Sequence, residues 1–203
     1  VDAQMANGSA DLTLTYSGGT TGTADVQNLA LSSVSAGTFS ASGVETIAVS
    51  NALTANSVTN ITGSSLTKIT VSGDQAFTMT GSTTVKGIDT AANSGKVSLV
   101  LGVATHTVTT GAGDDTINIG GNMSYADKIQ GGEGTDTIKL SVGNQTINGG
   151  ASATDTSAEF LQSGGFEIID IASTNDAATL NLANIAGVET VVAAANTKVV
   201  TFT

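Results

Sequence analysis

The chain has 203 residues, and its 17 acidic residues against 6 basic ones give a formal net charge of −11 at pH 7. A negative field of this strength disfavours nucleic acid and anionic membrane surfaces as partners. The absence of cysteine excludes disulfide bonds and thiolate metal sites, and the sequence has no apolar run of the roughly 18 residues that a membrane-spanning helix needs.

Short alternating strands are predicted over residues 1–91. Runs rich in β-branched residues alternate there with turns rich in Ser, Thr, Asn and Gly. The segment 43–49, GVETIAV, recurs 22 residues later as 65–71, SLTKITV. A strand repeated at such a period predicts stacked coils, each of which buries its apolar residues against its neighbours. We therefore expect β-solenoid coils in this N-terminal region.

A glycine- and aspartate-rich repeat follows. Residues 131–139, GGEGTDTIK, fit the calcium-binding nonapeptide G-G-x-G-x-D-x-U-x at every specified position. Glycine permits a positive φ, so that carbonyl oxygens converge on one point, and the aspartate at the sixth position adds a carboxylate. The apolar residue at the eighth position begins a short strand that points into a core.

The repeat keeps its register on the N-terminal side of this copy. Residues 110–118 supply Asp115 and Ile117 at the sixth and eighth positions, with only the first glycine replaced. Residues 101–109 keep a glycine and the apolar position but have His106 where the aspartate belongs.

Related units occur around and after the perfect copy. Residues 120–130 form the unit with two extra residues and contain Asp127, whereas residues 140–148 keep the core position but have Gln145 as the sixth residue. A further unit spans 149–155 and again reaches an aspartate. Together these units predict six or seven half-turns of a parallel roll, of which the central ones are best equipped for metal.

Solenoid strands are expected again near the C-terminus. The segment 165–171, GFEIIDI, recurs 22 residues later as 187–193, GVETVVA, and residues 158–162 are predicted to form a short helix. We therefore expect three regions in one elongated body, N-terminal coils over 1–91, the roll over 92–157 and C-terminal coils over 158–203. Since the pattern is cut at both ends, the chain is expected to be a piece of a longer one.

The glycine–aspartate units resemble the RTX repeats of bacterial proteins that are exported by type I secretion. The resemblance implies an all-β fold, a parallel β-roll or β-solenoid with right-handed stacked coils and Ca²⁺ between the loops. In that fold successive nonapeptides lie on opposite faces, so each loop stacks on the loop two units later. Asp115 is then expected beside Asp136, and Asp136 beside Asp155.

The opposite edge is expected to be a weaker metal site, because Asp127 would lie between His106 and Gln145, which supply no carboxylate. The residues expected to bind Ca²⁺ or to shape its loops are Thr110, Gly111, Gly113, Asp115, Gly120, Asp127, Gly131, Gly132, Gly134, Asp136, Gly149 and Asp155.

An alternative reading makes the glycine–aspartate clusters ordinary solvated turns, as they most often are in acidic proteins. The phase of the repeat argues against it, because free turns do not recur in step with the core positions Ile117, Ile129 and Ile138. Asp114 and Glu133 occupy variable positions of the unit, and we expect them to face solvent.

The sequence shows no catalytic constellation. His106 is the single histidine, so a two-histidine zinc site cannot form, and no G-x-S-x-G nucleophile turn is present. We therefore predict a protein that is not an enzyme.

Two function classes remain. The composition, and the solenoid turns on both sides of a short calcium roll, resemble the RTX-type surface-layer proteins of Gram-negative bacteria such as Caulobacter. That resemblance implies an extracellular structural protein whose partner is itself in a two-dimensional lattice, with outer-membrane lipopolysaccharide bound through a region outside this sequence. The alternative is the calcium-binding accessory region of a secreted protease, lipase, toxin or adhesin.

Overall fold

The computed structural model describes residues 2–16, 22–120, 123–140, 146–148, 163–171, 178–182, 185–193 and 200–202. These residues form strands and turns, and no helix occurs among them. They therefore contain no helix that could cross a bilayer. The short helix predicted at 158–162 lies outside the described residues.

Two long parallel sheets run along the molecule. The first has the strand order β1 (Ala3–Gly8), β3 (Val26–Val34), β5 (Thr46–Asn51), β8 (Lys68–Gly73), β10 (Gly87–Asn93), β12 (Thr107–Thr109) and β14 (Lys128–Gln130). The second has the order β6 (Asn56–Val58), β9 (Phe77–Thr83), β11 (Val97–Leu101), β13 (Thr116–Gly120), β15 (Thr137–Leu140), β17 (Ile168–Asp170) and β19 (Thr190–Val192).

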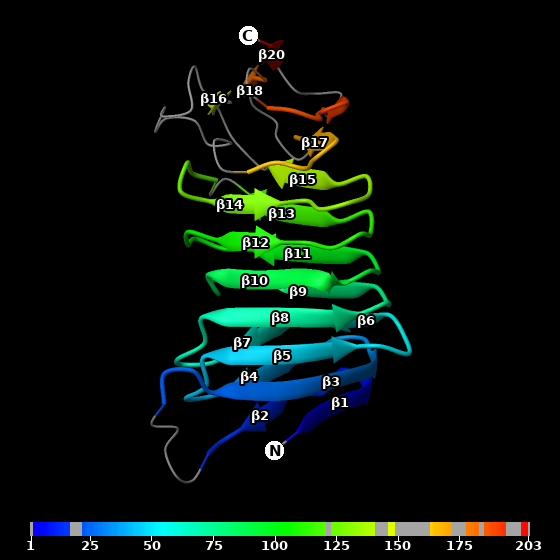
Figure 1. Cartoon of the computed structure of the whole chain (residues 1–203), viewed down its shortest axis with the longest axis vertical. Coiled ribbons are helices and arrows are strands. Elements are labelled where there is room, and N and C mark those ends of the chain that lie inside the picture. Colours follow the sequence, from blue (N-terminus) through cyan, green and yellow to red (C-terminus); the bar gives the residue numbers. More distant parts are fainter. Residues whose placement is uncertain are drawn as a thin grey trace.

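Two smaller parallel sheets lie at the ends of the chain. One joins β2 (Leu12–Leu14), β4 (Thr38–Ala41) and β7 (Asn60–Thr62), and the other joins β16 (Thr146–Asn148), β18 (Ala178–Asn181) and β20 (Val200–Phe202). From β8 to β15 the chain passes from one long sheet to the other with each new strand, so that it winds as a coil. Figure 1 shows the strands stacked along the long axis from the N-terminus to the C-terminus. The predicted all-β fold is confirmed as a β-solenoid of about six turns.

Columns of apolar side chains fill the interior between the two long sheets. Strand pairing places Ile47 beside Ile69, and the same column continues through Ile88, Val108 and Ile129. Each of these five side chains is almost completely buried. An equivalent column in the second sheet comprises Met79, Leu99, Ile117, Ile138 and Ile169. Like residues stack on like residues because each coil repeats the shape of the one below it.

The repeats found in the sequence coincide with coils of the solenoid. Ile47 lies beside Ile69, and Ile169 lies beside Val191, so both 22-residue recurrences are pairs of neighbouring strands. The apolar eighth positions at Ile117, Ile129 and Ile138 are fully buried, as predicted. Successive nonapeptides alternate between the two long sheets as far as β15. The first sheet continues through the expected boundary between 91 and 92, since β10 spans it.

Truncation of a side chain in these columns should be strongly destabilising. We expect Ile69→Ala to lower the free energy of unfolding by about 2–5 kcal/mol, because it removes buried methylene groups and leaves a cavity between rigid coils. Its neighbour Thr70 is partly exposed on the outer face of β8, so Thr70→Ala should change stability by less than about 1 kcal/mol. Urea unfolding of both variants measures the difference, and equal losses would contradict the assigned faces of β8.

Candidate metal centre

The turns that precede β13 and β15 stack directly on one another. Thr116 pairs with Thr137, so the residues just before them, Asp115 and Asp136, are neighbours in adjacent coils. The amide of Asp115 donates a hydrogen bond of 2.8 Å to Oδ1 of Asp136, and the amide of Val97 donates one of 2.7 Å to Oδ1 of Asp115. Both aspartate side chains are fully buried. The predicted juxtaposition of Asp115 and Asp136 is therefore confirmed.

One oxygen of each carboxylate has no hydrogen-bond partner. Oδ2 of Asp115 and Oδ2 of Asp136 are both buried, and no donor in the described part of the chain reaches either of them in hydrogen-bond geometry. The hydroxyl of Thr110 donates to the carbonyl oxygens of Gln130 and Gly131. A buried charged oxygen without a donor is costly unless a cation or a proton satisfies it.

Burial changes the pKa values of both aspartates. Burial raises the pKa of Asp115, although the nearby Val97 amide, Thr110 hydroxyl and Gly111 amide oppose the rise. The pKa of Asp136 is raised from 3.8 to about 7, chiefly by burial. The hydrogen bond from the Asp115 amide lowers this pKa, whereas the negative charges of Asp115, Glu167 and Asp114 raise it further. Without a cation, the site therefore retains a proton on Asp136 up to nearly neutral pH.

Glu167 is an acidic neighbour of Asp136 that the nonapeptide repeat did not predict. The strand next to β15 is β17, which places Glu167 beside Asp136. The amide of Asp136 donates a hydrogen bond of 2.7 Å to Oε2 of Glu167, and the amide of Glu167 donates one of 3.2 Å to the carbonyl oxygen of Asp136. The expected neighbour, Asp155, lies outside the described residues, as does Gly149. Glu167 occupies the position next to Asp136 that was predicted for Asp155.

A sequence signal for Glu167 exists in the N-terminal coils. The segment that begins at Gly43 contains Glu45, which matches Glu167 in the recurring pattern of glycine, apolar residue and glutamate. The amide of Asp25 donates a hydrogen bond of 2.9 Å to Oε2 of Glu45, and the amide of Glu45 donates one of 3.2 Å to the carbonyl oxygen of Asp25. In both regions, the glutamate of this motif is therefore hydrogen-bonded to the aspartate of the preceding coil.

The glycines of the repeat allow adjacent turns to approach closely. A Cβ atom on Gly131 would lie 1.8 Å from the carbonyl oxygen of Gly165 and 2.7 Å from Oδ2 of Asp136. Gly132 has a φ of +93°, and its Cβ would lie 2.1 Å from the carbonyl oxygen of Gly111. Backbone of the preceding coil fills the same space beside the other predicted loop glycines, Gly111, Gly113 and Gly134. Gly120 is at the far end of β13 from Asp115.

The opposite edge of the roll holds His106 and Asp127, both fully buried. Oδ1 of Asp127 accepts the amide of His106 at 2.7 Å, and Oδ2 accepts the amide and the hydroxyl of Ser124 at 2.7 and 2.9 Å. Nδ1 of His106 lies 3.9 Å from Oδ1 of Asp127. Because both oxygens of Asp127 accept hydrogen bonds within the protein, this carboxylate lacks the unpaired oxygen that Asp115 and Asp136 have.

Gln145, which was expected beside Asp127, lies outside the described residues, and the described strand of the 140–148 unit does not stack on β14. Strand β14 is bridged to Gly164 through Gln130, and the amide of Ile129 donates to the hydroxyl of Ser163. Strand β16 pairs instead with β18 in a separate sheet. The chain leaves its nonapeptide register after β15, so counting in nines no longer predicts which turns are neighbours.

Asp115, Asp136 and Glu167 therefore form a column in which the backbone amides of Asp115 and Asp136 each donate to the carboxylate of the next residue. In the described part of the chain, no three His, Cys, Asp or Glu side chains surround a common point. Two paired carboxylates with unsatisfied oxygens, among closely stacked loop carbonyl groups, fit a hard cation that takes oxygen ligands.

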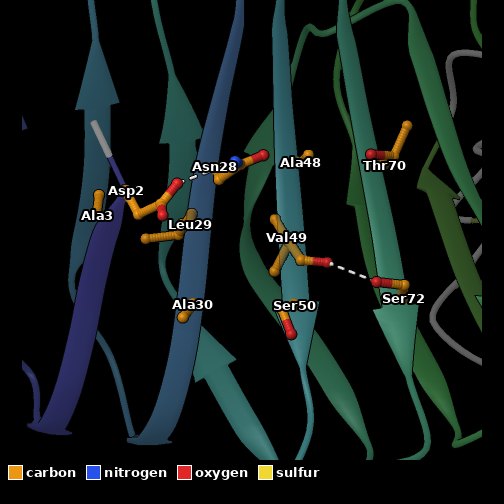
Figure 2. A pocket seen from close by; sticks show the side chains of 10 residues that line it. All are labelled: Asp2, Ala3, Asn28, Leu29, Ala30, Ala48, Val49, Ser50, Thr70 and Ser72. Atoms are coloured by element: carbon orange, nitrogen blue, oxygen red, sulfur yellow. Dashed lines mark hydrogen bonds between the residues drawn. The ribbon is translucent and has the colours of Figure 1, made fainter.

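A shallow groove of about 360 Å³ lies on the outer face of the first sheet, away from this column. Figure 2 shows its floor crossing β1, β3, β5 and β8, with Asp2 hydrogen-bonded to Asn28 at 3.0 Å near one end. Small side chains at Ala30, Ala48 and Ser50 give this face a low relief.

Comparisons of the chain with protein-family models, with curated proteins and with solved structures give no significant match.

Proposed function

We propose that the chain is a calcium-binding structural protein that self-assembles into a two-dimensional lattice at a bacterial cell surface. The observation that carries the proposal is the stacked pair of buried carboxylates at Asp115 and Asp136, each with one oxygen that nothing in the described protein satisfies. A divalent cation would neutralise both charges and occupy both oxygens.

Calcium suits this site better than magnesium. Ca²⁺ accepts six to eight oxygen ligands in a flexible geometry, whereas Mg²⁺ demands a compact octahedron and gives up its water reluctantly. Carboxylates fixed in consecutive coils, with loop carbonyl groups around them, offer oxygens at positions that the strand spacing determines. Thr110 and the loop glycines Gly111, Gly131 and Gly132 shape the turns around these carboxylates.

The shape and charge of the molecule support the lattice part of the proposal. A solenoid offers long sides and two open ends, which favour lateral and end-to-end contacts between copies. The low relief of the outer face at Ala30, Ala48 and Ser50 permits a second flat surface to approach closely. A net charge of −11 keeps copies apart until cations reduce it, so calcium both orders the roll and permits association. Anchoring to lipopolysaccharide would need a region outside this chain.

We expect self-association to begin at calcium concentrations of about 10⁻⁴–10⁻³ M, the range typical of extracellular calcium modules. Light scattering during titration with calcium, and with magnesium as the control, followed by electron microscopy, tests this directly. Ordered sheets that dissolve in chelator are the expected result. Monomers at high calcium would contradict the lattice and favour an accessory region of a secreted protein.

A further inference from the structure

Asp136 is hydrogen-bonded to an acidic residue of the neighbouring coil on both of its sides. Toward the N-terminus its Oδ1 accepts the amide of Asp115, and toward the C-terminus its own amide donates to Oε2 of Glu167 at 2.7 Å. Its Oδ2 has no donor in the described structure, although the side chain is fully buried. The column therefore contains a second pair of acidic residues in neighbouring coils, and one of them, Glu167, lies outside the nonapeptide repeat.

The unsatisfied oxygen of Asp136 lies close to the coil that carries Glu167 as well as to that of Asp115. The position where a Cβ atom of Gly131 would lie is 2.7 Å from Oδ2 of Asp136 and 1.8 Å from the carbonyl oxygen of Gly165. Because both oxygens lie so close to one point, they are within a few ångströms of each other. Gly165 has a φ of +69°, which turns the chain there. Phe166 anchors the turn by burying its ring in the core, and Glu167 follows at once.

We infer that Asp136, Glu167 and the carbonyl oxygen of Gly165 form a second calcium site, which joins the C-terminal coils to the roll. This inference rests on the proposed calcium-binding function. Each carboxylate oxygen has two lone pairs, so Asp136 can serve cations on both of its sides. The two halves of the site are 31 residues apart in sequence, whereas Asp115 and Asp136 are 21 apart. Calcium at this position holds β17 against β15 across a longer stretch of chain.

The two sites therefore stabilise different parts of the chain. The Asp115–Asp136 site lies wholly inside the roll and orders it. The Asp136–Glu167 site determines whether β17, and with it β19, stays stacked on the roll, because β17 pairs with both β15 and β19. Loss of the second site should therefore loosen the C-terminal coils and leave the roll intact.

Three variants separate the sites by the number of calcium ions bound. Asp115→Asn and Glu167→Gln should each bind one ion fewer than the wild type, and Asp136→Asn should bind two fewer. Glutamine at 167 retains an oxygen that accepts the Asp136 amide, so the turn keeps its hydrogen bond and loses only its charge. Glu189→Gln is the matched control, since Glu189 follows Glu167 by one coil and is exposed. Equilibrium dialysis of the whole chain counts the ions.

Hydrogen exchange of the amides at 168–170 provides a second readout. With a dissociation constant of about 1 mM, 10 mM calcium should slow their exchange about tenfold in the wild type, in Asp115→Asn and in the control. No such slowing is expected in Glu167→Gln. A Glu167→Gln protein that binds as many ions as the wild type, or an equal loss in Glu189→Gln, would overturn the second site while the Asp115 result upholds the first. A wild type that binds no calcium would overturn the proposed function itself.

Discussion

Replacing Asp136 with asparagine should stabilise the calcium-free protein at pH 8 and abolish its stabilisation by calcium. The pKa of Asp136 is raised from 3.8 to about 7 in the folded state, chiefly by burial. Between these two values the folded state retains a proton that the unfolded state releases, so stability falls as the pH rises and is lowest above pH 7. At about 1.4 kcal/mol per unit, the loss is on the order of 4 kcal/mol. Asparagine avoids this loss because it carries no charge, and its side-chain oxygen can still accept the Asp115 amide.

Thermal unfolding at pH 5 and pH 8, each in chelator and in 10 mM calcium, measures both effects. The wild type should be less stable at pH 8 than at pH 5 in chelator, and calcium should reverse this order, because the cation replaces the proton. Asp114→Asn is the control, since Asp114 is exposed, its Oδ1 accepts the amide of Thr135, and its charge is the smallest of those that raise the pKa of Asp136. Two results would contradict the assignment of Asp136 as a ligand. One is an Asp136→Asn variant that is less stable than the wild type in chelator at pH 8, and the other is a variant that calcium still stabilises.

Gly131→Ala should destabilise the protein by more than about 3 kcal/mol, the upper end of the usual cost of overpacking. Its Cβ would lie 1.8 Å from the carbonyl oxygen of Gly165, which belongs to the backbone of the next coil and cannot rotate away. The two coils must separate, and the pairing of β15 with β17 is lost with them.

The neighbouring coil offers a matched control in Gly164→Ala. The nearest atom to its new Cβ would be Oε1 of Gln130 at 3.7 Å, an ordinary contact with a side chain, so a change of less than about 1 kcal/mol is expected. Denaturant unfolding of both variants, with hydrogen exchange at β17, measures the contrast. Similar stabilities for the two variants would show that the coils at 131 and 165 can move apart freely.

The parts of the fold that depend on strand patterning could be predicted from the sequence. The columns through Ile47 and Ile69, and through Ile117 and Ile138, follow from apolar residues that recur in phase, because a parallel strand buries alternate residues against the equivalent strand of the next coil. The contact between Asp115 and Asp136 follows from the same phase, since each aspartate directly precedes a paired threonine.

Glu167 could not be found by counting residues, because the number of residues in a coil is not fixed. Val97 and the carboxylate that binds its amide are 18 residues apart, whereas Asp136 and Glu167 are 31 apart. The next coil is selected by the fit of its buried residues rather than by its distance along the chain. The glycine–apolar–glutamate motif shared with Glu45 was a better guide than the period of nine.

The burial of His106 also could not be predicted from the repeat pattern. Its position in the repeat predicts a turn that has lost its aspartate, but the structure places the ring fully inside the protein, with Nε2 3.3 Å from the carbonyl oxygen of Thr83. A turn residue becomes buried only when the coils above and below extend beyond it, and a single repeat contains no information about that.

The direction of the hydrogen bonds gives the molecule an anisotropic response to mechanical force. The hydrogen bonds between strands run along the axis on which Figure 1 shows the strands stacked, with one ladder in each long sheet between neighbouring coils. Tension between the two ends of the stack therefore loads these ladders in series, and the weakest ladder opens first and releases the length of a single coil. Tension across the stack instead pulls along the strands and loads many bonds in parallel. A layer in which solenoids lie flat and are pulled along their strands would resist stretching far better than one in which they are pulled end to end.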